Sequence, residues 1–221
     1  MGKSAVAAEE RAKPGRPRDP ERTKEDILKV AAEEFAKLGL SGARVDAIAA
    51  RTHTTKRMIY YYFESKEGLY NAVLERAYGG IRQIEANMKL DELDPETALR
   101  RLVEFSFDYH EAHPEFIRLV MIENIHNAEH VRGSDILRRT NSPAISVLTG
   151  IMERGYSSGV FKRPIDPVEL HMMISALSFY RVSNRATFNA LYNVDIGSLK
   201  TRERQRRYVA DAVILLMTAP A

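Results

Sequence analysis

Residues Ala43 to Tyr70 read A-R-V-D-A-I-A-A-R-T-H-T-T-K-R-M-I-Y-Y-Y-F-E-S-K-E-G-L-Y, and this stretch decides the fold. Its first apolar residues have the i, i+3, i+4 spacing of a two-turn helix: Val45, Ile48 and Ala49. Thr52-His53-Thr54 interrupts that pattern, and Thr55 is a suitable cap for a second short helix through Ile59 to Phe63. Two short helices joined by such a turn predict a helix-turn-helix unit, whose second helix fits the major groove of DNA.

The second helix is rich in side chains that donate hydrogen bonds. These cationic and phenolic donors are Lys56, Arg57, Tyr60, Tyr61 and Tyr62. Donors of both kinds suit the phosphates and base edges of a duplex, so the sequence favours DNA as the partner.

Residues 55 to 70, T-K-R-M-I-Y-Y-Y-F-E-S-K-E-G-L-Y, resemble the recognition-helix signature of the TetR family of one-component transcriptional repressors. The resemblance covers about residues 23 to 70 and includes positions ahead of the signature: Phe35, Gly39, Val45, Ile48 and Ala49. It implies that the tyrosines and Lys66 contact phosphates and that Lys56 and Arg57 approach bases. Arg44 and Thr55 are further candidate DNA-binding residues.

Three positions depart from the family pattern. His53 stands where a turn glycine is usual. If the turn uses a left-handed backbone conformation, a non-glycine residue must adopt it. Arg57 replaces a second small residue and is a candidate base reader. Arg44 replaces the usual Ser or Thr, so a hydroxyl cap is lost, while its guanidinium could gain a phosphate contact.

The resemblance implies an all-α fold with a three-helix DNA-binding domain and a larger C-terminal domain for ligand binding and dimerisation. We place a basic arm at residues 1–19, the helix-turn-helix domain at 20–70, and the larger domain at 71–221. Within the arm, Pro-Gly-Arg-Pro-Arg resembles an AT-hook core, in which Arg16 and Arg18 enter the minor groove. The alternative is a disordered tail that serves only solubility.

Capping residues ahead of proline mark most later helix starts. Asp19-Pro20 begins the first helix, which Gly39 stops, and Ser65 caps a long helix from Lys66 to about Met88. The remaining predicted helices lie at about 95–112, 115–127, 143–156, 167–193 and 201–218. No stretch keeps a period of two, so we expect no sheet.

The last two long helices are apolar nearly all round, which requires cover on every face. By resemblance, they pair with the same helices of a second subunit in a four-helix bundle. The alternative is a central helix buried within a monomer. The basic run Lys200 to Arg207 is either a solvated helix face or a contact for an acidic partner.

Two further groups of side chains allow more than one interpretation. Glu123, His126 and His130 have helical spacing that could bind zinc, although a polar helix end lining a pocket or facing solvent is the simpler explanation. Candidate ligand-binding residues, most of which could equally be ordinary core, are Phe105, Tyr109, Met121, Asn124, Met152, Met173 and Phe179.

Composition agrees with this interpretation. The chain has 221 residues, 44% hydrophobic and 29% charged, and a net charge of only +3, so a DNA-binding role depends on where the charge lies. The absence of cysteine excludes disulfides, thiolate metal sites and a cysteine nucleophile. No apolar run has the length of a membrane span and no signal peptide is recognisable, so we expect a cytoplasmic protein.

We therefore predict a homodimeric repressor that binds double-stranded DNA at an inverted repeat and leaves it when a small-molecule effector binds. We expect no cofactor, no metal and no membrane contact. A glycine-rich phosphate loop and a G-x-S-x-G motif are absent, so an α-helical enzyme lacks support. The main alternative is a helical ligand- or metal-binding protein without operator binding.

Overall fold

A computed structural model of the protein describes residues 19–220. Those residues contain eleven α-helices, one short 3-10 helix and no strand, which confirms the predicted all-α class. The helices are α1 (Pro20–Gly42), α2 (Val45–Arg51), α3 (Lys56–Phe63), α4 (Lys66–Ala86), η1 (Leu90–Glu92), α5 (Pro95–Ala112), α6 (Pro114–Ile125), α7 (Glu129–Arg132), α8 (Asp135–Ser157), α9 (Pro167–Ser183), α10 (Arg185–Tyr192) and α11 (Leu199–Thr218).

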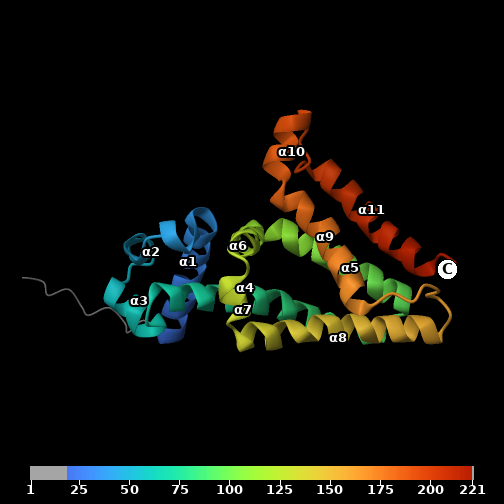
Figure 1. Cartoon of the computed structure of the whole chain (residues 1–221), viewed down its shortest axis with the longest axis horizontal. Helices are drawn as coiled ribbons and strands as arrows, with labels where there is room; N and C mark the ends of the chain where they lie inside the picture. The colour runs from blue at the N-terminus through green and yellow to red at the C-terminus, as the bar shows by residue number, and fades with distance from the viewer. Residues whose placement is uncertain (1–18, 221) are drawn as a thin grey trace, which may run out of the picture.

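The molecule is elongated, with α1, α2 and α3 gathered at one end (Figure 1). We call α1 to α3 and the first half of α4 the reading head. Helix α4 leaves the head and runs beside α8 into the larger part, where α11 packs along α5 and α9 crosses them. Helix α6 packs against α1, so α6 and α4 both join the two parts.

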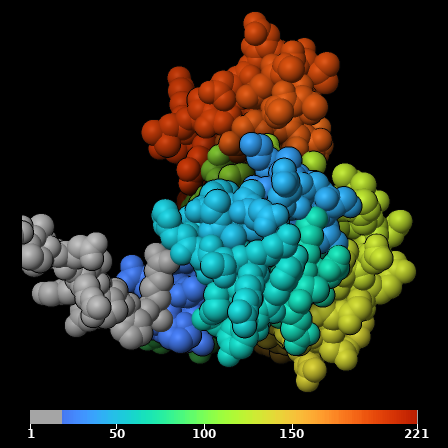
Figure 2. All heavy atoms as spheres, turned by 90° about the vertical axis from the view of Figure 1, so that its left-hand side faces the viewer, coloured from blue at the N-terminus to red at the C-terminus, as the bar shows by residue number. Residues whose placement is uncertain are grey.

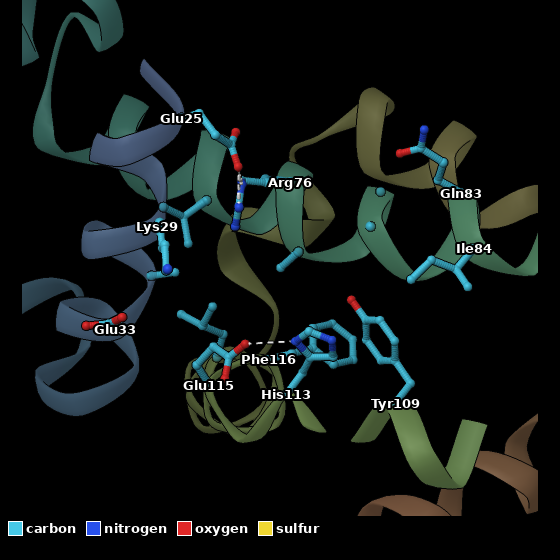
Figure 3. A pocket seen from close by; sticks show the side chains of 16 residues that line it. Glu25, Lys29, Glu33, Arg76, Gln83, Ile84, Tyr109, His113, Glu115 and Phe116 are labelled. Atoms are coloured by element: carbon cyan, nitrogen blue, oxygen red, sulfur yellow. Dashed lines mark hydrogen bonds and ion pairs between the residues drawn. The ribbon is translucent and has the colours of Figure 1, made fainter. Parts of the chain in front are cut away.

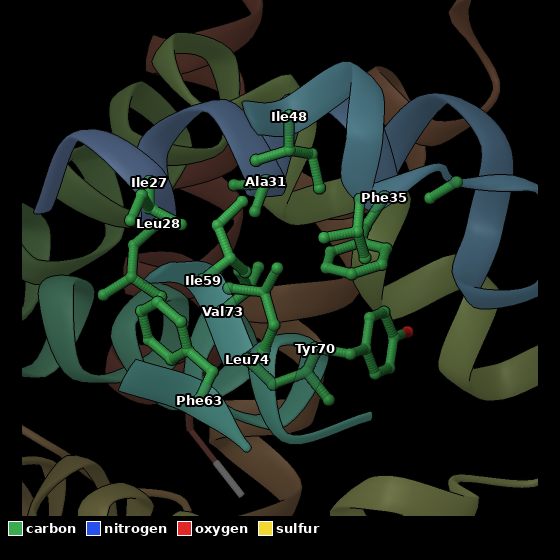
Figure 4. Close-up of a cluster of buried hydrophobic side chains, with 14 of the residues drawn as sticks. Ile27, Leu28, Ala31, Phe35, Ile48, Ile59, Phe63, Tyr70, Val73 and Leu74 are labelled. Atoms are coloured by element: carbon green, nitrogen blue, oxygen red, sulfur yellow. The ribbon is translucent and has the colours of Figure 1, made fainter. Parts of the chain in front are cut away.

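The reading head forms because its capped helices bury one shared apolar cluster (Figure 4). The side chains of Asp19, Thr55 and Ser65 each accept a backbone N–H in the first turn of α1, α3 and α4. Phe35 and Tyr70 meet edge to face at 5.0 Å within the fully buried centre. The cluster continues into Leu119 of α6 and Leu137 of α8, so the head shares its core with the larger part.

Two predicted helix boundaries were wrong. Helix α8 begins at Asp135 rather than near 143, because the Ser134 hydroxyl caps it by accepting the Leu137 N–H at 3.1 Å. Pro143 lies inside α8 on its exposed side, where water can satisfy the carbonyl that lacks an N–H partner. The helix predicted over 167–193 breaks at Asn184, whose side-chain amide donates to the Tyr180 carbonyl at 3.3 Å.

The basic run at the start of α11 is only partly a solvated face. Arg206 contacts Glu104 at 3.1 Å and Asp108 at 2.8 Å, and Arg202 also reaches Asp108. Further along α11, Asp211 forms an ion pair with Arg100 of α5 at 2.7 Å. These ion pairs join α11 to α5. The exposed cations of the same run, which fit the prediction of a solvated face, are Lys200, Arg204 and Arg207.

The turn between α3 and α4 is unusually tight. Glu64 has φ 65° and ψ −52°, and the Ser65 N–H donates to the Phe63 carbonyl at 2.7 Å, which is the geometry of a strained γ-turn. The next helix consequently starts close to that carbonyl. A Cβ atom on Gly68 would lie 2.1 Å from the Phe63 oxygen, a distance that no side chain tolerates.

Gly68→Ala should therefore lower the free energy of unfolding by about 2–4 kcal/mol, since backbone must move to admit the methyl group. Gly150→Ala is the matched control, because a Cβ atom added to Gly150 within α8 would meet nothing within 4 Å. This control should instead gain about 0.5–1 kcal/mol from helix propensity. Chemical denaturation of both variants measures the difference, and equal effects would contradict the tight-turn geometry.

Candidate DNA-binding surface, domain joint and effector cavity

The outer face of α3 carries the exposed donors that the sequence singled out. Figure 2 views the molecule from the reading-head end, where α2 and α3 form the central surface. Arg57, Tyr60 and Tyr61 are exposed there, Tyr61 by 76%, whereas Tyr62 is half-buried against the head core. Tyr61 and Tyr62 also meet edge to face at 5.4 Å, which limits the freedom of the exposed ring. A cationic and phenolic surface is thus held on a short rigid helix.

The cations on this surface differ in their partners. Lys56 pairs with Asp46 of α2 at 3.2 Å, and the Lys66 ammonium donates to the Ser41 carbonyl at 3.2 Å. Arg57 forms no ion pair or hydrogen bond with any described residue. Of these three, Arg57 therefore keeps its full set of donors for another molecule.

The remaining predicted contacts have clear positions. Arg44 is exposed at the start of α2 and provides no side-chain cap, as its replacement of a hydroxyl residue predicted. The Thr55 hydroxyl accepts the Met58 N–H at 3.2 Å and so serves first as the cap of α3. Arg16 and Arg18 of the predicted minor-groove arm lie outside the described residues.

His53 occupies the turn between α2 and α3 with φ 51°. The left-handed backbone usually supplied by glycine is therefore adopted by a histidine, at a cost of about 1 kcal/mol. The flanking hydrogen bonds hold it there: the Thr54 N–H donates to the Ala49 carbonyl at 3.1 Å. The sequence identified this position but could not show which backbone conformation it adopts.

A buried carboxylate joins the reading head to the larger part. Glu123 of α6 is 3% exposed, and its Oε1 accepts the Tyr70 hydroxyl of α4 at 2.9 Å. The same carboxylate lies 3.1 Å from His130 Nδ1 and accepts the backbone N–H groups of His130 and Val131 at 3.2 and 3.3 Å. We call Tyr70, Glu123 and His130 the domain joint. It ties α4, α6 and α7 at one point.

Glu123 and His130 thus connect helices. The sequence suggested either a zinc site or a polar helix end lining a pocket or facing solvent, and neither explanation anticipated this role. His126 is exposed at the end of α6 and does not join them, and the described residues contain no group of three side chains suited to a metal ion. Burial, and then the hydrogen bond to Glu123, raises the pKa of Tyr70 above its ordinary value, so its hydroxyl stays protonated and donates.

The seven candidate ligand-binding residues are not brought together. Phe105, Tyr109, Met121 and Phe179 belong to one small cluster between α5, α6 and α9. The other three lie elsewhere: Met152 is core, Asn124 is exposed with its amide bonded to the Val120 carbonyl, and Met173 lies on the open face of α9. Whether any of them contacts an effector stays a prediction.

Close to that cluster, His110 is buried and its Nδ1 has no hydrogen-bond partner among the described residues. Burial lowers the pKa of His110 to about 4, and the positive charge of Arg82 adds to this shift. His110 is therefore neutral at physiological pH and belongs to the core beside Phe116 and Phe179, with ring centroids 6.1 and 6.3 Å away. His113, three residues along, faces a cavity instead.

A cavity of about 770 Å³ lies between the reading head and the larger part (Figure 3). Its walls come from α1, from the middle of α4, and from the junction of α5 and α6. Tyr109 is the one candidate ligand residue of the sequence that lines it. Its other lining residues include Glu25, Lys29, Glu33, Arg76, Gly79, Gly80, His113, Glu115 and Phe116. Its volume falls within the range of small-molecule sites.

The fold and this surface define a helix-turn-helix DNA-binding regulator with a second, helical domain. Residues 27–73 match the family described as bacterial regulatory proteins, tetR family, and residues 95–213 match the tetracyclin repressor-like C-terminal domain. The chain belongs to the TetR family of transcriptional regulators, which confirms the resemblance seen in its sequence. Repressors of this family bind DNA and a ligand and work as dimers.

Individual proteins agree. The chain is 38% identical to the HTH-type transcriptional repressor NicS of Pseudomonas putida over 199 residues, which cover 90% of this chain and 94% of NicS. It is 28% identical to the regulator RutR of Escherichia coli over 153 residues, covering 69% and 70%. The structure of SCO4942 from Streptomyces coelicolor superposes with a TM-score of 0.66 at 28% identity, covering 90% of this chain and 99% of that one.

The protein is accordingly a non-enzymatic regulator, in line with the names of its relatives. No helix within residues 19–220 is both long enough and apolar enough to cross a membrane.

The domain joint provides a test of the interface between head and larger part. Tyr70→Phe keeps the ring but removes the hydrogen bond to a buried carboxylate, and should lower the free energy of unfolding by about 1.5–3 kcal/mol. Tyr78→Phe removes a half-buried hydroxyl of the same helix that has no hydrogen-bond partner among the described residues, and should be nearly neutral. Urea denaturation compares them, and a Tyr70→Phe value within error of the control would refute the joint.

Proposed function

We propose that this protein is a dimeric repressor that binds an inverted-repeat operator and releases it when a small-molecule effector binds. The observation that carries the proposal is the outer face of α3, where Arg57 and two tyrosines are exposed on a rigid helix in a TetR-family chain. Phosphate and base contacts are the use that requires such a surface. This supports operator binding over the alternative of a ligand-binding protein without it.

We assign positioning to the phenols and to Lys66, and base reading to Arg57. Arginine donates bidentately to guanine O6 and N7, which is the commonest specific contact in the major groove. Lys56 is the second candidate base reader, and it must leave Asp46 to reach a base. The site of action is then cytoplasmic DNA.

The proposed subunit contact uses α9 and α11. Exposed apolar side chains follow one face of each helix, including Met172 (64% exposed), Tyr180 (57%), Tyr208 (62%) and Leu215 (66%). On a monomer, such a face would leave a large apolar area in water, and a second copy covers it. A two-fold axis through this contact presents two α3 helices to one duplex, which supports an inverted repeat.

The effector acts through the two helices that join the parts. Helix α4 begins beside α3, and α6 packs on α1. The domain joint connects α4 to α6 through the hydrogen bond from Tyr70 to Glu123. A ligand that favours another arrangement of α6 against α1 changes the spacing of the two reading heads. The linkage is reciprocal, so operator DNA must weaken effector binding by the same factor.

Arg57→Ala should cost about 1–3 kcal/mol in operator binding and relax the preference at one base pair, because a bidentate contact is lost. Lys66→Ala is the comparison: it should weaken operator and random DNA alike and flatten the salt dependence, as expected for a phosphate contact. Fluorescence anisotropy with operator DNA selected from a random pool measures both. If Arg57→Ala weakens both kinds of DNA equally, Arg57 is not a base reader.

The dimer contact has its own test. Leu215→Glu places a charge on the face proposed to be covered and should shift the protein toward monomer at micromolar concentration. Ile136→Glu changes a comparably exposed apolar residue on α8, 54% exposed and outside that face, and should leave the dimer intact. Sedimentation velocity reads the mass of each. A wild-type monomer, or a dimer unaffected by Leu215→Glu, would exclude this contact.

A further inference from the structure

The open faces of α9 and α11 adjoin to form one surface. A notch of about 220 Å³ lies between them, and its walls include Leu177 and Tyr180 of α9 and Tyr208 of α11. These three side chains are exposed by 43%, 57% and 62%. A partner that covers the open face of one helix at the notch therefore also contacts the other helix.

The two helices run in opposite directions across this surface. Next to α10, Arg181 near the end of α9 donates to the side-chain oxygen of Gln205 near the start of α11 at 2.6 Å. Away from α10, the N–H of Lys162, ahead of α9, donates to the carbonyl of Met217, near the end of α11, at 2.8 Å. The surface thus has an α10 end, with the start of α11, and a far end, with the start of α9 (Figure 1).

The two ends of the surface carry charges of opposite sign. At the far end, Glu169 is exposed one turn ahead of the exposed Met173 on the open face of α9. At the α10 end, Lys200 and Arg204 are exposed on successive turns of α11 and are followed, one turn later, by Tyr208. The acidic side chain and the basic pair therefore lie in line with the apolar residues of the same surface.

These three charges have no partner within the described chain. The Glu169 carboxylate, the Lys200 ammonium and the Arg204 guanidinium form no hydrogen bond or ion pair with any of residues 19–220. The acidic Asp211, further along the open side of α11, differs from them because it pairs with Arg100 at 2.7 Å. The surface thus offers a free carboxylate at one end and free cations at the other.

Other charges near the two ends do not share these positions. Lys162 and Arg163 lie in the loop ahead of α9, and the Arg163 guanidinium donates to the Pro220 carbonyl at 3.1 and 3.2 Å. Glu203 is exposed on α11, but a neighbour in the helix projects about 100° around the axis from Arg204. The opposite signs therefore belong to the faces that carry the exposed apolar residues.

The helix macrodipole explains the acidic end but not the basic end. Glu169 lies in the first turn of α9, where a carboxylate is stabilising. Lys200 lies in the first turn of α11, where a cation is destabilising, and Ser198 provides no side-chain cap there. The basic start of α11 therefore lacks local compensation, and a carboxylate from another molecule would supply it.

We propose that a second copy of this chain covers the surface with the two-fold axis transverse to α9 and α11. Glu169 of each copy then lies at the same end as Lys200 and Arg204 of the partner subunit, and ion pairs form at both ends of the contact. An axis along the helices would instead bring like ends, and hence like charges, together. The proposal rests on the proposed function for the use of α9 and α11, and adds the orientation of the contact.

An exchange of charges between two chains tests this orientation. One chain carries Glu169→Arg and the other carries Lys200→Glu with Arg204→Glu. Each homodimer then has like charges at both ends and should be weakened about 10-fold at low salt, because each contact occurs twice by symmetry. A mixture restores opposite charges at both ends of the heterodimer, which should exceed the statistical half of all dimers. Native mass spectrometry measures the proportions, and circular dichroism checks that the helices persist.

The matched control is Glu153→Arg, which reverses an exposed carboxylate on α8, outside the contact. Mixed with the chain that carries Lys200→Glu and Arg204→Glu, it should give only the statistical half of heterodimer. The orientation is overturned if Glu169→Arg also gives only that half, or if the control gives an equal excess.

The Leu215→Glu variant separates this proposal from the proposed function. If Leu215→Glu splits the dimer while the charge exchange gives no excess of heterodimer, α9 and α11 remain the contact and the transverse axis is wrong. If Leu215→Glu leaves the dimer intact, the contact itself is excluded, and the orientation with it.

Discussion

The arrangement of the whole molecule depends on one buried carboxylate. Glu123 has almost no contact with water, so its charge is tolerable only while its hydrogen-bond donors stay in place. Those donors come from α4 through Tyr70 and from α7 through the His130 ring and two backbone N–H groups. Any movement that separates α4 from α7 removes donors from this buried carboxylate and is opposed by the cost of leaving it unsatisfied.

The larger part is organised to transmit such a movement. Helix α6 carries Glu123 near its end and lines the cavity near its beginning, while its middle packs on α1. In the proposed mechanism, this helix connects the cavity at one end to the domain joint at the other. The ion pairs between α5 and α11 keep the opposite side of the larger part in register.

The sequence predicted the reading head well because its signals are local. Caps at Thr55 and Ser65 and the apolar spacing around Ile48 and Ile59 act within a few residues, and the structure has helices where they indicate. The backbone conformation of His53 could not be predicted from the sequence. The residue type shows only that glycine is absent, whereas the positive φ is held by the hydrogen bonds of the surrounding turn. The predictions at Pro143 and Asn184 failed for a similar reason, since proline is tolerated where a helix side faces water and asparagine ends a helix only when its amide reaches the backbone.

The domain joint and the cavity could not be predicted from local sequence signals, because their residues are far apart in the chain. Glu123 and Tyr70 lie 53 positions apart, and the pairing follows from the packing of α6 against α1 and of Phe116 of α6 against Tyr78 of α4. Likewise, Lys29 of α1 and Tyr109 of α5 share a cavity only because those helices converge.

The two glycines of α4 have a consequence beyond the shape of the cavity. Each lowers local helix stability by about 1 kcal/mol relative to alanine, and here they are adjacent at the point where α4 passes from the head to the larger part. The intrinsic helix propensity of α4 is therefore lowest between its two anchored halves. Under the proposed function, the turn of α4 that carries these glycines is where the helix can bend at the lowest cost as the head moves.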